Sequence, residues 1–166
     1  MGDPLGIGPE VLVKALSDPR FARAARLVIY GQNQVLAWTA ERLGGEPHWD
    51  RGAHDSDRAT QPIVTDMVVL DFPEYEPVLG ASPAPTRTGG LVSKSCVEVA
   101  IADALRPASD PRHIDAIVTG PICKESWMLA GFRWPGHTEL LAHRTRAKRC
   151  AMAFVSPRLR VTLATA

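Results

Sequence analysis

The sequence contains no apolar run long enough to cross a bilayer and no pattern typical of a secretory signal peptide. It has no excess of charge of one sign, because 19 Lys and Arg oppose 18 Asp and Glu, which leaves a formal net charge of +1. We therefore expect neither nucleic acid nor a membrane as a partner. The sequence also has no Walker loop, nucleophile elbow, internal repeat or recognisable metal-ligand spacing.

Cysteine is scarce as well. The three cysteines, Cys96, Cys123 and Cys150, lie far apart and form no CxxC pair. This pattern predicts reduced thiols and a cytoplasmic protein. With 166 residues, 45% of them apolar and 22% charged, the chain has the composition of one globular domain of ordinary size.

Short apolar runs alternate with helical patterns along the chain, which predicts an α/β fold. The last two runs flank Ser156-Pro157 and indicate a hairpin, so we expect a mixed, mostly parallel sheet flanked by helices. The expected strands are 27–30, 63–64 with 67–70, 114–118, 150–155 and 159–163, and the expected helices are 8–16, 32–43, 91–105, 125–130 and one beginning at Thr138.

Both ends of the sequence look cut out of a larger pattern. The glycine-rich loop Gly2–Gly8 follows Met1 directly, although such a loop normally comes after a β-strand. The apolar run 160–166 stops without a turn or a cap. We therefore expect a fragment of a longer protein. Two stretches, 46–61 and 71–87, are predicted as irregular, and the second is long enough to be a functional or mobile loop.

The most informative stretch is Thr119–Lys124, which follows the apolar run Ile114–Val118. The run predicts a buried strand that ends at a Gly-Pro turn and leads into a helix. This arrangement places Lys124 at the carboxyl edge of a sheet, where open α/β sheets bind ligands. A helix-start lysine can also be merely solvated, but a cation there is mildly unfavourable, which favours a role with an anionic ligand.

A second segment, Pro135–Glu139, opens a helical pattern with Gly136, His137 and Thr138. The free N–H groups of a helix start attract anions, phosphate above all. His137 and Thr138 are therefore candidates for binding an acidic ligand together with Lys124. The alternative is structural, with the histidine and the threonine hydroxyl capping the helix.

The loop from Gly2 to Glu10 holds three closely spaced glycines, which allow the backbone to approach a ligand, but it is not the dinucleotide fingerprint GxGxxG. Asp3 in this loop is either a ligand contact or a turn former. The remaining candidates favour structural roles: a packed thiol for Cys123, a wall or core position for Trp127 and Trp134, and surface positions for His48, His54, His113 and His143.

Three motifs, Met1-Gly-Asp-Pro-Leu-Gly-Ile-Gly-Pro-Glu10, Thr119-Gly-Pro-Ile-Cys-Lys124 and Pro135-Gly-His-Thr-Glu139, closely resemble the 4-hydroxythreonine-4-phosphate dehydrogenase family of pyridoxal phosphate biosynthesis. The resemblance covers the whole chain but only about the first half of a family member. It implies an isocitrate/isopropylmalate dehydrogenase-like α/β fold with two subdomains, and a homodimer with shared active sites. His137 and Thr138 match positions that contact substrate in the family. Asp3 and Lys124 match motif positions, which implies a substrate contact for Asp3 and a catalytic role for Lys124.

The resemblance implies oxidation of the hydroxyl of a small phosphorylated hydroxy amino acid by NAD or NADP, followed by decarboxylation. It also implies a divalent metal (Zn, Mg or Co) that polarises the hydroxyl. The family's metal-binding histidines and most of its cofactor contacts lie beyond Ala166, and the family's opening strand precedes Met1. We therefore assign no metal ligand and no cofactor contact to this chain, and we expect it to be inactive alone.

Three other functions remain open. A paralogous dehydrogenase of a sugar-acid phosphate or a dihydrodiol carboxylate shares the motifs of this half. A phosphate acyltransferase resembles the same fold superfamily but needs neither metal nor nicotinamide. A non-catalytic remnant that only folds or dimerises is the third.

Overall fold

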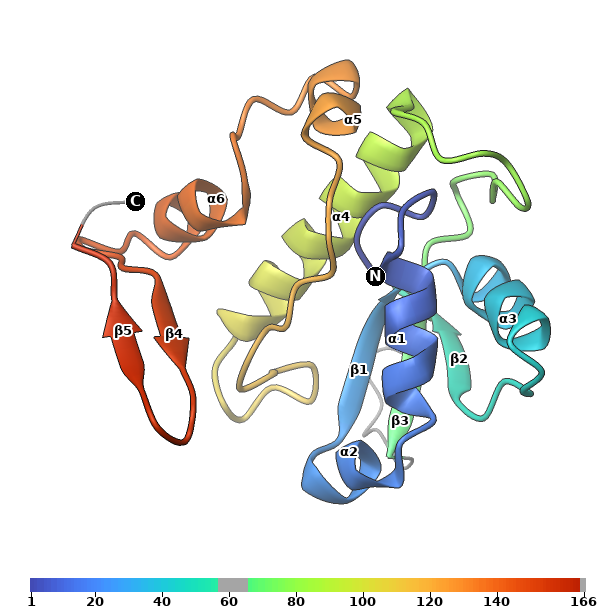
Figure 1. The fold of residues 1–166 in the computed structure, drawn as a ribbon, viewed down its shortest axis with the longest axis horizontal. Helices are drawn as coiled ribbons and strands as arrows, with labels where there is room; N and C mark the ends of the chain where they lie inside the picture. Colours follow the sequence, from blue (N-terminus) through green and yellow to red (C-terminus); the bar gives the residue numbers. More distant parts are fainter. Residues whose placement is uncertain (57–65, 165–166) are drawn as a thin grey trace. The chain divides into compact units, whose positions relative to one another are not determined.

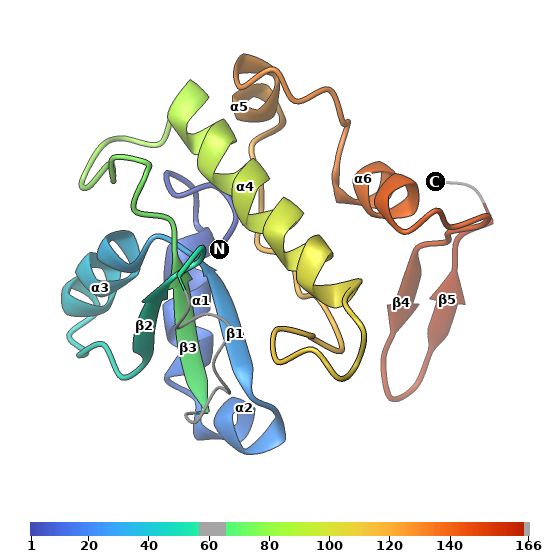
Figure 2. The same cartoon turned by 180° about the vertical axis from the view of Figure 1, so that it is seen from behind.

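The structure, a computed structural model, describes residues 1–56 and 66–164. The chain divides into two compact units, residues 1–133 and residues 134–166, and each is described by itself. The sequence had suggested one domain of ordinary size. Figures 1 and 2 show the elements from two opposite sides.

The first unit is an α/β structure, as predicted. Its parallel sheet has the order β1-β3-β2, with β1 in register with β3 from Leu27 opposite Met67 to Gly31 opposite Asp71. The elements are α1 (Gly8–Leu16), α2 (Pro19–Ala24), β1 (Leu27–Gly31), α3 (Asn33–Arg42), β2 (Asp50–Ala53), β3 (Met67–Asp71), α4 (Arg87–Ala104) and α5 (Lys124–Leu129).

Alternate residues of β1 and β3 build two apolar layers, one on each face of the sheet. Ile29 and Val69 pack with residues of α1 and α3 on one face. Tyr30 and Leu70 pack with residues of α4 on the other. Figures 1 and 2 show α1 and α4 on opposite sides of the sheet. The carboxyl ends of the three parallel strands therefore lie between helices on both faces, where a ligand site is expected.

Local sequence signals account for the helix starts. Pro9 lies in the first turn of α1, as predicted from the Gly8-Pro9-Glu10 stretch. Helix α4 begins four residues earlier than the predicted Leu91, because the Thr86 side chain accepts a hydrogen bond from the Gly89 N–H and caps the helix. Gly89 and Gly90 are therefore part of the helix and do not precede it.

The predicted central strand 114–118 is wrong. This segment has no strand conformation, Ile114 and Ile117 are only partly buried, and Val118 is 97% exposed. A strand needs a hydrogen-bonded neighbour along its length. The described backbone bonds at this place reach only the following turn, where the Asp3 N–H donates to the Pro121 carbonyl.

Two elements were not predicted. Helix α2 begins at Pro19, with the Asp18 side chain accepting from the Arg20 N–H. Strand β2 lies in the stretch predicted as irregular and pairs with β3. The predicted strand residues 63–64 lie outside the described residues. The expected long loop 71–87 is confirmed between Phe72 and Thr86.

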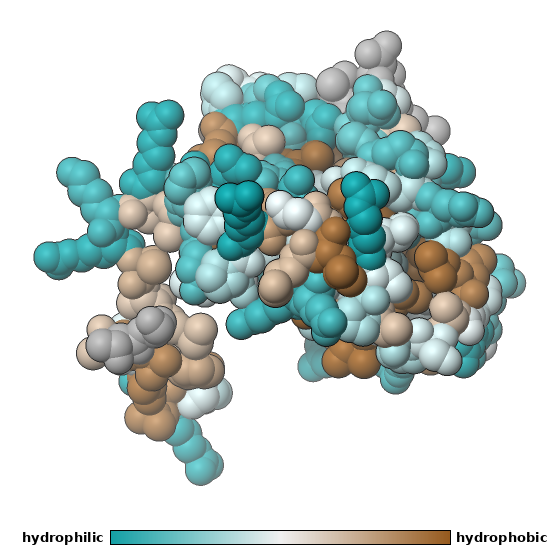
Figure 3. Space-filling model, turned by 90° about the horizontal axis from the view of Figure 1, so that it is seen from above, coloured by the Kyte–Doolittle hydropathy of each residue, from teal (hydrophilic) through white to brown (hydrophobic). Residues whose placement is uncertain are grey.

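The second unit contains α6 (His137–Arg144), β4 (Ala153–Val155) and β5 (Arg160–Thr162). The predicted hairpin is confirmed, since β4 and β5 pair antiparallel. It forms a two-stranded sheet of its own, so the expectation of one mixed sheet is corrected. Several apolar side chains of the hairpin are exposed, among them Phe154 and Val155. Figure 3 shows the hydrophobic (brown) and hydrophilic (teal) residues on one face of the molecule. Among the described residues, no helix is long and apolar enough to span a membrane.

Candidate active site

The glycine loop ends at the start of α1 and carries Asp3 on its inner side. The Asp3 side chain is 3% exposed, and its Oδ1 accepts a hydrogen bond of 2.9 Å from the Leu5 N–H. The nitrogen of Met1 donates to the Tyr30 carbonyl at 2.8 Å, which fixes the loop next to the end of β1. The turn-forming role that the sequence left open for Asp3 is therefore present in the structure. Its contact with substrate stays a prediction.

Lys124 is the first residue of α5 and is exposed. Helix α5 itself is firmly held, because Ser126 and Trp127 are fully buried. The hydroxyl of Ser126 accepts from the Thr86 N–H at 3.1 Å, and the Trp127 indole N–H donates to the Ser93 hydroxyl at 2.9 Å. The core position predicted for Trp127 is confirmed. The helix is thus fixed, and the cationic side chain of Lys124 at its start is exposed to solvent.

His137 and Thr138 occupy the first two positions of α6, and both are partly buried. The preceding Gly136 provides no side-chain cap for the helix start. Burial lowers the pKa of the His137 imidazole below its ordinary value, which favours the neutral ring at pH 7. A neutral imidazole can both donate and accept a hydrogen bond.

The predicted site residues therefore fall into two groups. Asp3 and Lys124 belong to the first unit, and Lys124 comes three positions after Pro121, whose carbonyl accepts a hydrogen bond from the Asp3 N–H. His137 and Thr138 are neighbours in the second unit. The convergence of Lys124 with His137 on one ligand stays a prediction.

A metal site would need several His, Cys, Asp or Glu side chains close together. Over residues 1–56 and 66–164, no group of three or more His, Cys, Asp or Glu side chains is arranged to hold a metal ion. The described side chains thus do not fit the divalent ion that the family resemblance implies.

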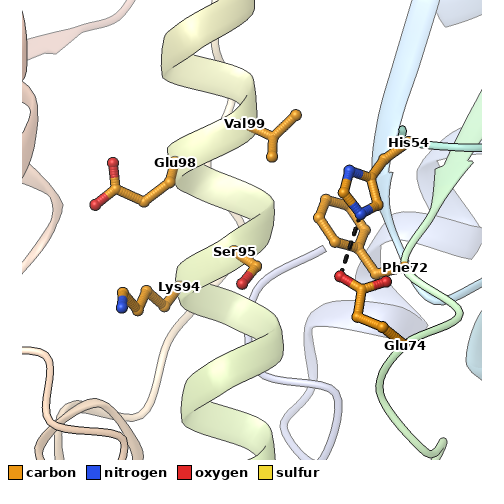
Figure 4. Close-up of a pocket in the computed structure, with 7 residues that line it drawn as sticks. All are labelled: His54, Phe72, Glu74, Lys94, Ser95, Glu98 and Val99. Carbon is orange, nitrogen blue, oxygen red and sulfur yellow. Dashed lines mark hydrogen bonds and ion pairs between the residues drawn. The ribbon is translucent and has the colours of Figure 1, made fainter. Parts of the chain in front are cut away.

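Sequence reasoning missed a hollow of about 340 Å³ where β2 and β3 end. Figure 4 shows the His54 ring stacked on Phe72, with ring centroids 4.1 Å apart, and its Nε2 lies 3.1 Å from Glu74 Oε1. The surface position predicted for His54 is corrected, because this side chain is only 20% exposed. Its place directly after β2 was the available signal, but β2 itself was not predicted. The lining residues are His54, Phe72, Glu74, Lys94, Ser95, Glu98 and Val99.

The other predicted surface histidines differ among themselves. His113 is partly buried and its Nδ1 lies 2.8 Å from the Arg106 carbonyl, so its surface assignment is also corrected. His48 and His143 are exposed, as predicted. The ring of His143 lies 4.7 Å from that of the partly buried Trp134.

The three cysteines are free, and their burial predicts different reactivities. Cys96 is 3% exposed, and burial raises the pKa of its thiol to about 11, whereas Cys150 is exposed and Cys123 is partly buried. Because the thiolate is the reactive form, we expect iodoacetamide at pH 8 to modify Cys150 first, Cys123 more slowly and Cys96 only after unfolding. Peptide mass mapping over time measures this order. Modification of Cys96 in the folded protein at the rate of Cys150 would contradict it.

Comparison with known proteins places these features in a family. The family model described as pyridoxal phosphate biosynthetic protein PdxA matches residues 23–166. This chain belongs to the PdxA family. It is 36% identical over 156 residues to 4-hydroxythreonine-4-phosphate dehydrogenase of a Synechocystis strain, covering 93% of this chain and 40% of that protein. It is 38% identical over 165 residues to D-threonate 4-phosphate dehydrogenase of Salmonella typhimurium, covering 97% of this chain and 47% of that protein.

The PdxA fold is also recognised in three dimensions. The crystal structure of 4-hydroxythreonine-4-phosphate dehydrogenase from Klebsiella pneumoniae superimposes with a TM-score of 0.76 at 33% identity, covering 98% of this chain and 47% of that one. The predicted α/β dehydrogenase fold is thereby confirmed. This PdxA-family chain spans less than half the length of these relatives.

Proposed function

We propose that this chain is the N-terminal part of an NAD(P)-dependent dehydrogenase that oxidises 4-hydroxy-L-threonine 4-phosphate in pyridoxal phosphate biosynthesis. The observation that carries the proposal is similarity along nearly the whole chain to dehydrogenases of that name. The family-model match, residues 23–166, includes the motifs that contain Lys124, His137 and Thr138. We further propose that the protein works in the cytoplasm as a homodimer.

The chain's own residues bind and orient the substrate in this proposal. The exposed ammonium of Lys124 neutralises an anionic group of the substrate, which also stabilises negative charge during the reaction. The largely neutral His137 ring and the Thr138 hydroxyl form hydrogen bonds with its polar groups. NAD or NADP, when bound, accepts a hydride from the carbon that carries the oxidised hydroxyl.

Charge in the second unit supports a phosphorylated substrate. Residues 134–166 hold six of the chain's 19 Lys and Arg but only one of its 18 acidic residues. These basic residues begin at Arg144, in the last turn of α6, and the one acidic residue, Glu139, lies in its first turn. The net charge of the unit and the dipole of α6 therefore favour an anion at the helix start.

The test is an assay of the full-length protein with 4-hydroxy-L-threonine 4-phosphate, NAD or NADP and a divalent metal (Zn, Mg or Co in turn), followed by the absorbance of NADH or NADPH. Turnover supports the proposal, and an absence of reduction with either cofactor contradicts it. Acyl transfer without any response to NAD would identify the acyltransferase alternative. The 166-residue chain should show no turnover in the same assay, and light scattering would show whether it dimerises.

A second substrate is favoured by a specific observation, the 38% identity to D-threonate 4-phosphate dehydrogenase. Both candidate substrates are phosphorylated hydroxy acids. Only 4-hydroxy-L-threonine 4-phosphate carries an amino group. Comparison of kcat/KM for the two substrates on the full-length protein decides between them.

Replacing His137 by Ala in the full-length protein should lower kcat/KM about 10- to 100-fold, because a hydrogen bond to a charged or reacting group is lost. His143→Ala is the matched control, since this exposed histidine lies on the same helix six residues on. It should leave kcat/KM within about twofold of wild type. Equal effects of the two substitutions would remove His137 from the site.

A further inference from the structure

Three segments that are far apart in sequence meet at Asp3. Its backbone N–H donates to the Pro121 carbonyl at 3.0 Å, and its Oδ1 accepts from the Leu5 N–H at 2.9 Å. The same oxygen lies against the first turn of α4, because a Cβ added to Gly89 would be 2.8 Å from it. One residue thus contacts the glycine loop, the turn before α5 and the start of α4.

The glycine loop and the turn touch through their backbones. A Cβ on Gly2 would lie 2.3 Å from the Pro121 carbonyl oxygen, and a Cβ on Gly120 would lie 2.3 Å from the Met1 carbonyl oxygen. Neither position has room for a side chain. A displacement of the loop at Asp3 must therefore displace the turn as well.

The turn leads directly to Lys124, which begins α5 three residues after Pro121. Helix α5 is itself held by Thr86. The Thr86 hydroxyl caps α4, and the Thr86 N–H donates to the hydroxyl of Ser126 in α5. The position of Lys124 is consequently set from two sides, by the Asp3 contact on the turn and by the Ser126 contact on the helix.

The Asp3 carboxylate is enclosed by the protein. Its Oδ2 is buried and has no hydrogen-bond partner among the described residues. A buried charge needs compensation, and the positive end of the α4 dipole is the feature beside it. A side chain that is 3% exposed is poorly placed to contact a substrate.

We propose that Asp3 is a positioning residue that fixes the Thr119–Lys124 turn, and that it does not bind the substrate directly. The role of Lys124 rests on the proposed function, but the contact that Asp3 makes with the turn does not. Asp3 acts through its turn-forming oxygen, which an Asn side chain reproduces and an Ala side chain lacks.

Hydrogen exchange on the full-length protein tests the positioning itself. Asp3→Ala should speed amide exchange in residues 2–6 and 119–126 about tenfold or more, whereas Asp3→Asn should change it less than about threefold. Asp18→Ala is the matched control, because Asp18 makes the same kind of bond, to the Arg20 N–H at 3.0 Å, away from the turn. It should leave exchange in 119–126 unchanged. Unchanged exchange in Asp3→Ala would overturn the proposal.

Activity separates positioning from substrate contact. With positioning, kcat/KM falls more in Asp3→Ala than in Asp3→Asn, in the same order as the loss of exchange protection. Equal, large losses of kcat/KM in both variants, with exchange in Asp3→Asn unchanged, would show a charge contact with substrate and overturn the proposal. If Asp3→Ala does not fold, the Asn variant decides by the same two measurements. If the full-length protein has no dehydrogenase activity, the proposed function fails and the exchange experiment still decides the positioning.

Discussion

Replacing Asp103 by Asn should lower the free energy of unfolding of the 166-residue chain by about 3–5 kcal/mol, because it removes the charge from a buried ionic network. The Asp103 side chain is 2% exposed. Its Oδ2 accepts from Arg112 Nη2 at 2.8 Å and from the Tyr30 hydroxyl at 2.9 Å, and its Oδ1 accepts from Arg106 Nε at 2.8 Å. The Arg112 side chain, 10% exposed, would be left without its counter-ion.

The network joins elements that are far apart in sequence. Tyr30 belongs to β1, Asp103 lies near the end of α4, and Arg112 also donates to the His54 carbonyl at 2.8 Å. Burial raises the pKa of the Tyr30 hydroxyl, so it remains a donor to the carboxylate over the ordinary pH range. Loss of the Asp103 charge should therefore loosen β1, α4 and the wall of the His54 hollow together.

Urea denaturation followed by circular dichroism measures the effect. Tyr30→Phe removes one hydrogen bond to the carboxylate and should lower the free energy of unfolding by about 1.5 kcal/mol. This milder variant can still be measured if Asp103→Asn does not fold. Glu10→Gln is the control, because it neutralises an exposed acid paired with Lys14 on α1 and should leave the urea midpoint unchanged. A stability loss in Asp103→Asn no larger than in Tyr30→Phe would contradict the buried-charge explanation.

Elements with strong local signals could be predicted from the sequence, and elements that depend on a distant partner could not. Pro9 and Glu10 predict the start of α1, and the β-prone residues Met67–Leu70 predict a strand. The run 114–118 has equally apolar residues, but a strand exists only where a neighbouring backbone can pair with it. Conversely, β2 contains Asp50 and Arg51, so its pairing with β3 has no apolar signature.

The candidate site shows the same division. Lys124, His137 and Thr138 could be selected from their motifs, since each follows a turn or begins a helix. The hydrogen bond from Asp3 to Pro121 could not be predicted, because the two residues are far apart in the chain and no sequence pattern indicates that they are in contact. The stacked pair of His54 and Phe72 likewise depends on β2 and β3 lying side by side.

Replacing Gly90 by Ala should lower the free energy of unfolding by about 2 kcal/mol or more, although the same change inside an ordinary helix raises it by about 1 kcal/mol. An added Cβ would lie 1.9 Å from the Ser126 carbonyl oxygen and 2.5 Å from its carbonyl carbon. These are backbone atoms, which cannot rotate away as the end of a side chain can. Helix α5 must therefore move away from α4.

This movement would disturb the contacts that hold α5. The Trp127 indole, 0% exposed, donates to Ser93 on α4 and packs edge-on against Phe132 at 4.6 Å. Because Lys124 begins the same helix, the substitution should displace the proposed catalytic lysine as well as destabilise the fold. In the full-length protein we expect kcat/KM to fall further than the loss of folded protein explains.

Gly6→Ala is the matched control, because its Cβ would meet only the Asp3 carbonyl oxygen at 3.4 Å and the Asp3 Cβ at 3.8 Å, which are ordinary contacts. Its stability should stay within about 0.5 kcal/mol of wild type. Urea midpoints give the two stability changes, and hydrogen exchange in residues 124–129 shows whether α5 is the element that loosens. A Gly90→Ala protein as stable as wild type, with α5 still protected, would mean that α4 and α5 do not pack backbone to backbone.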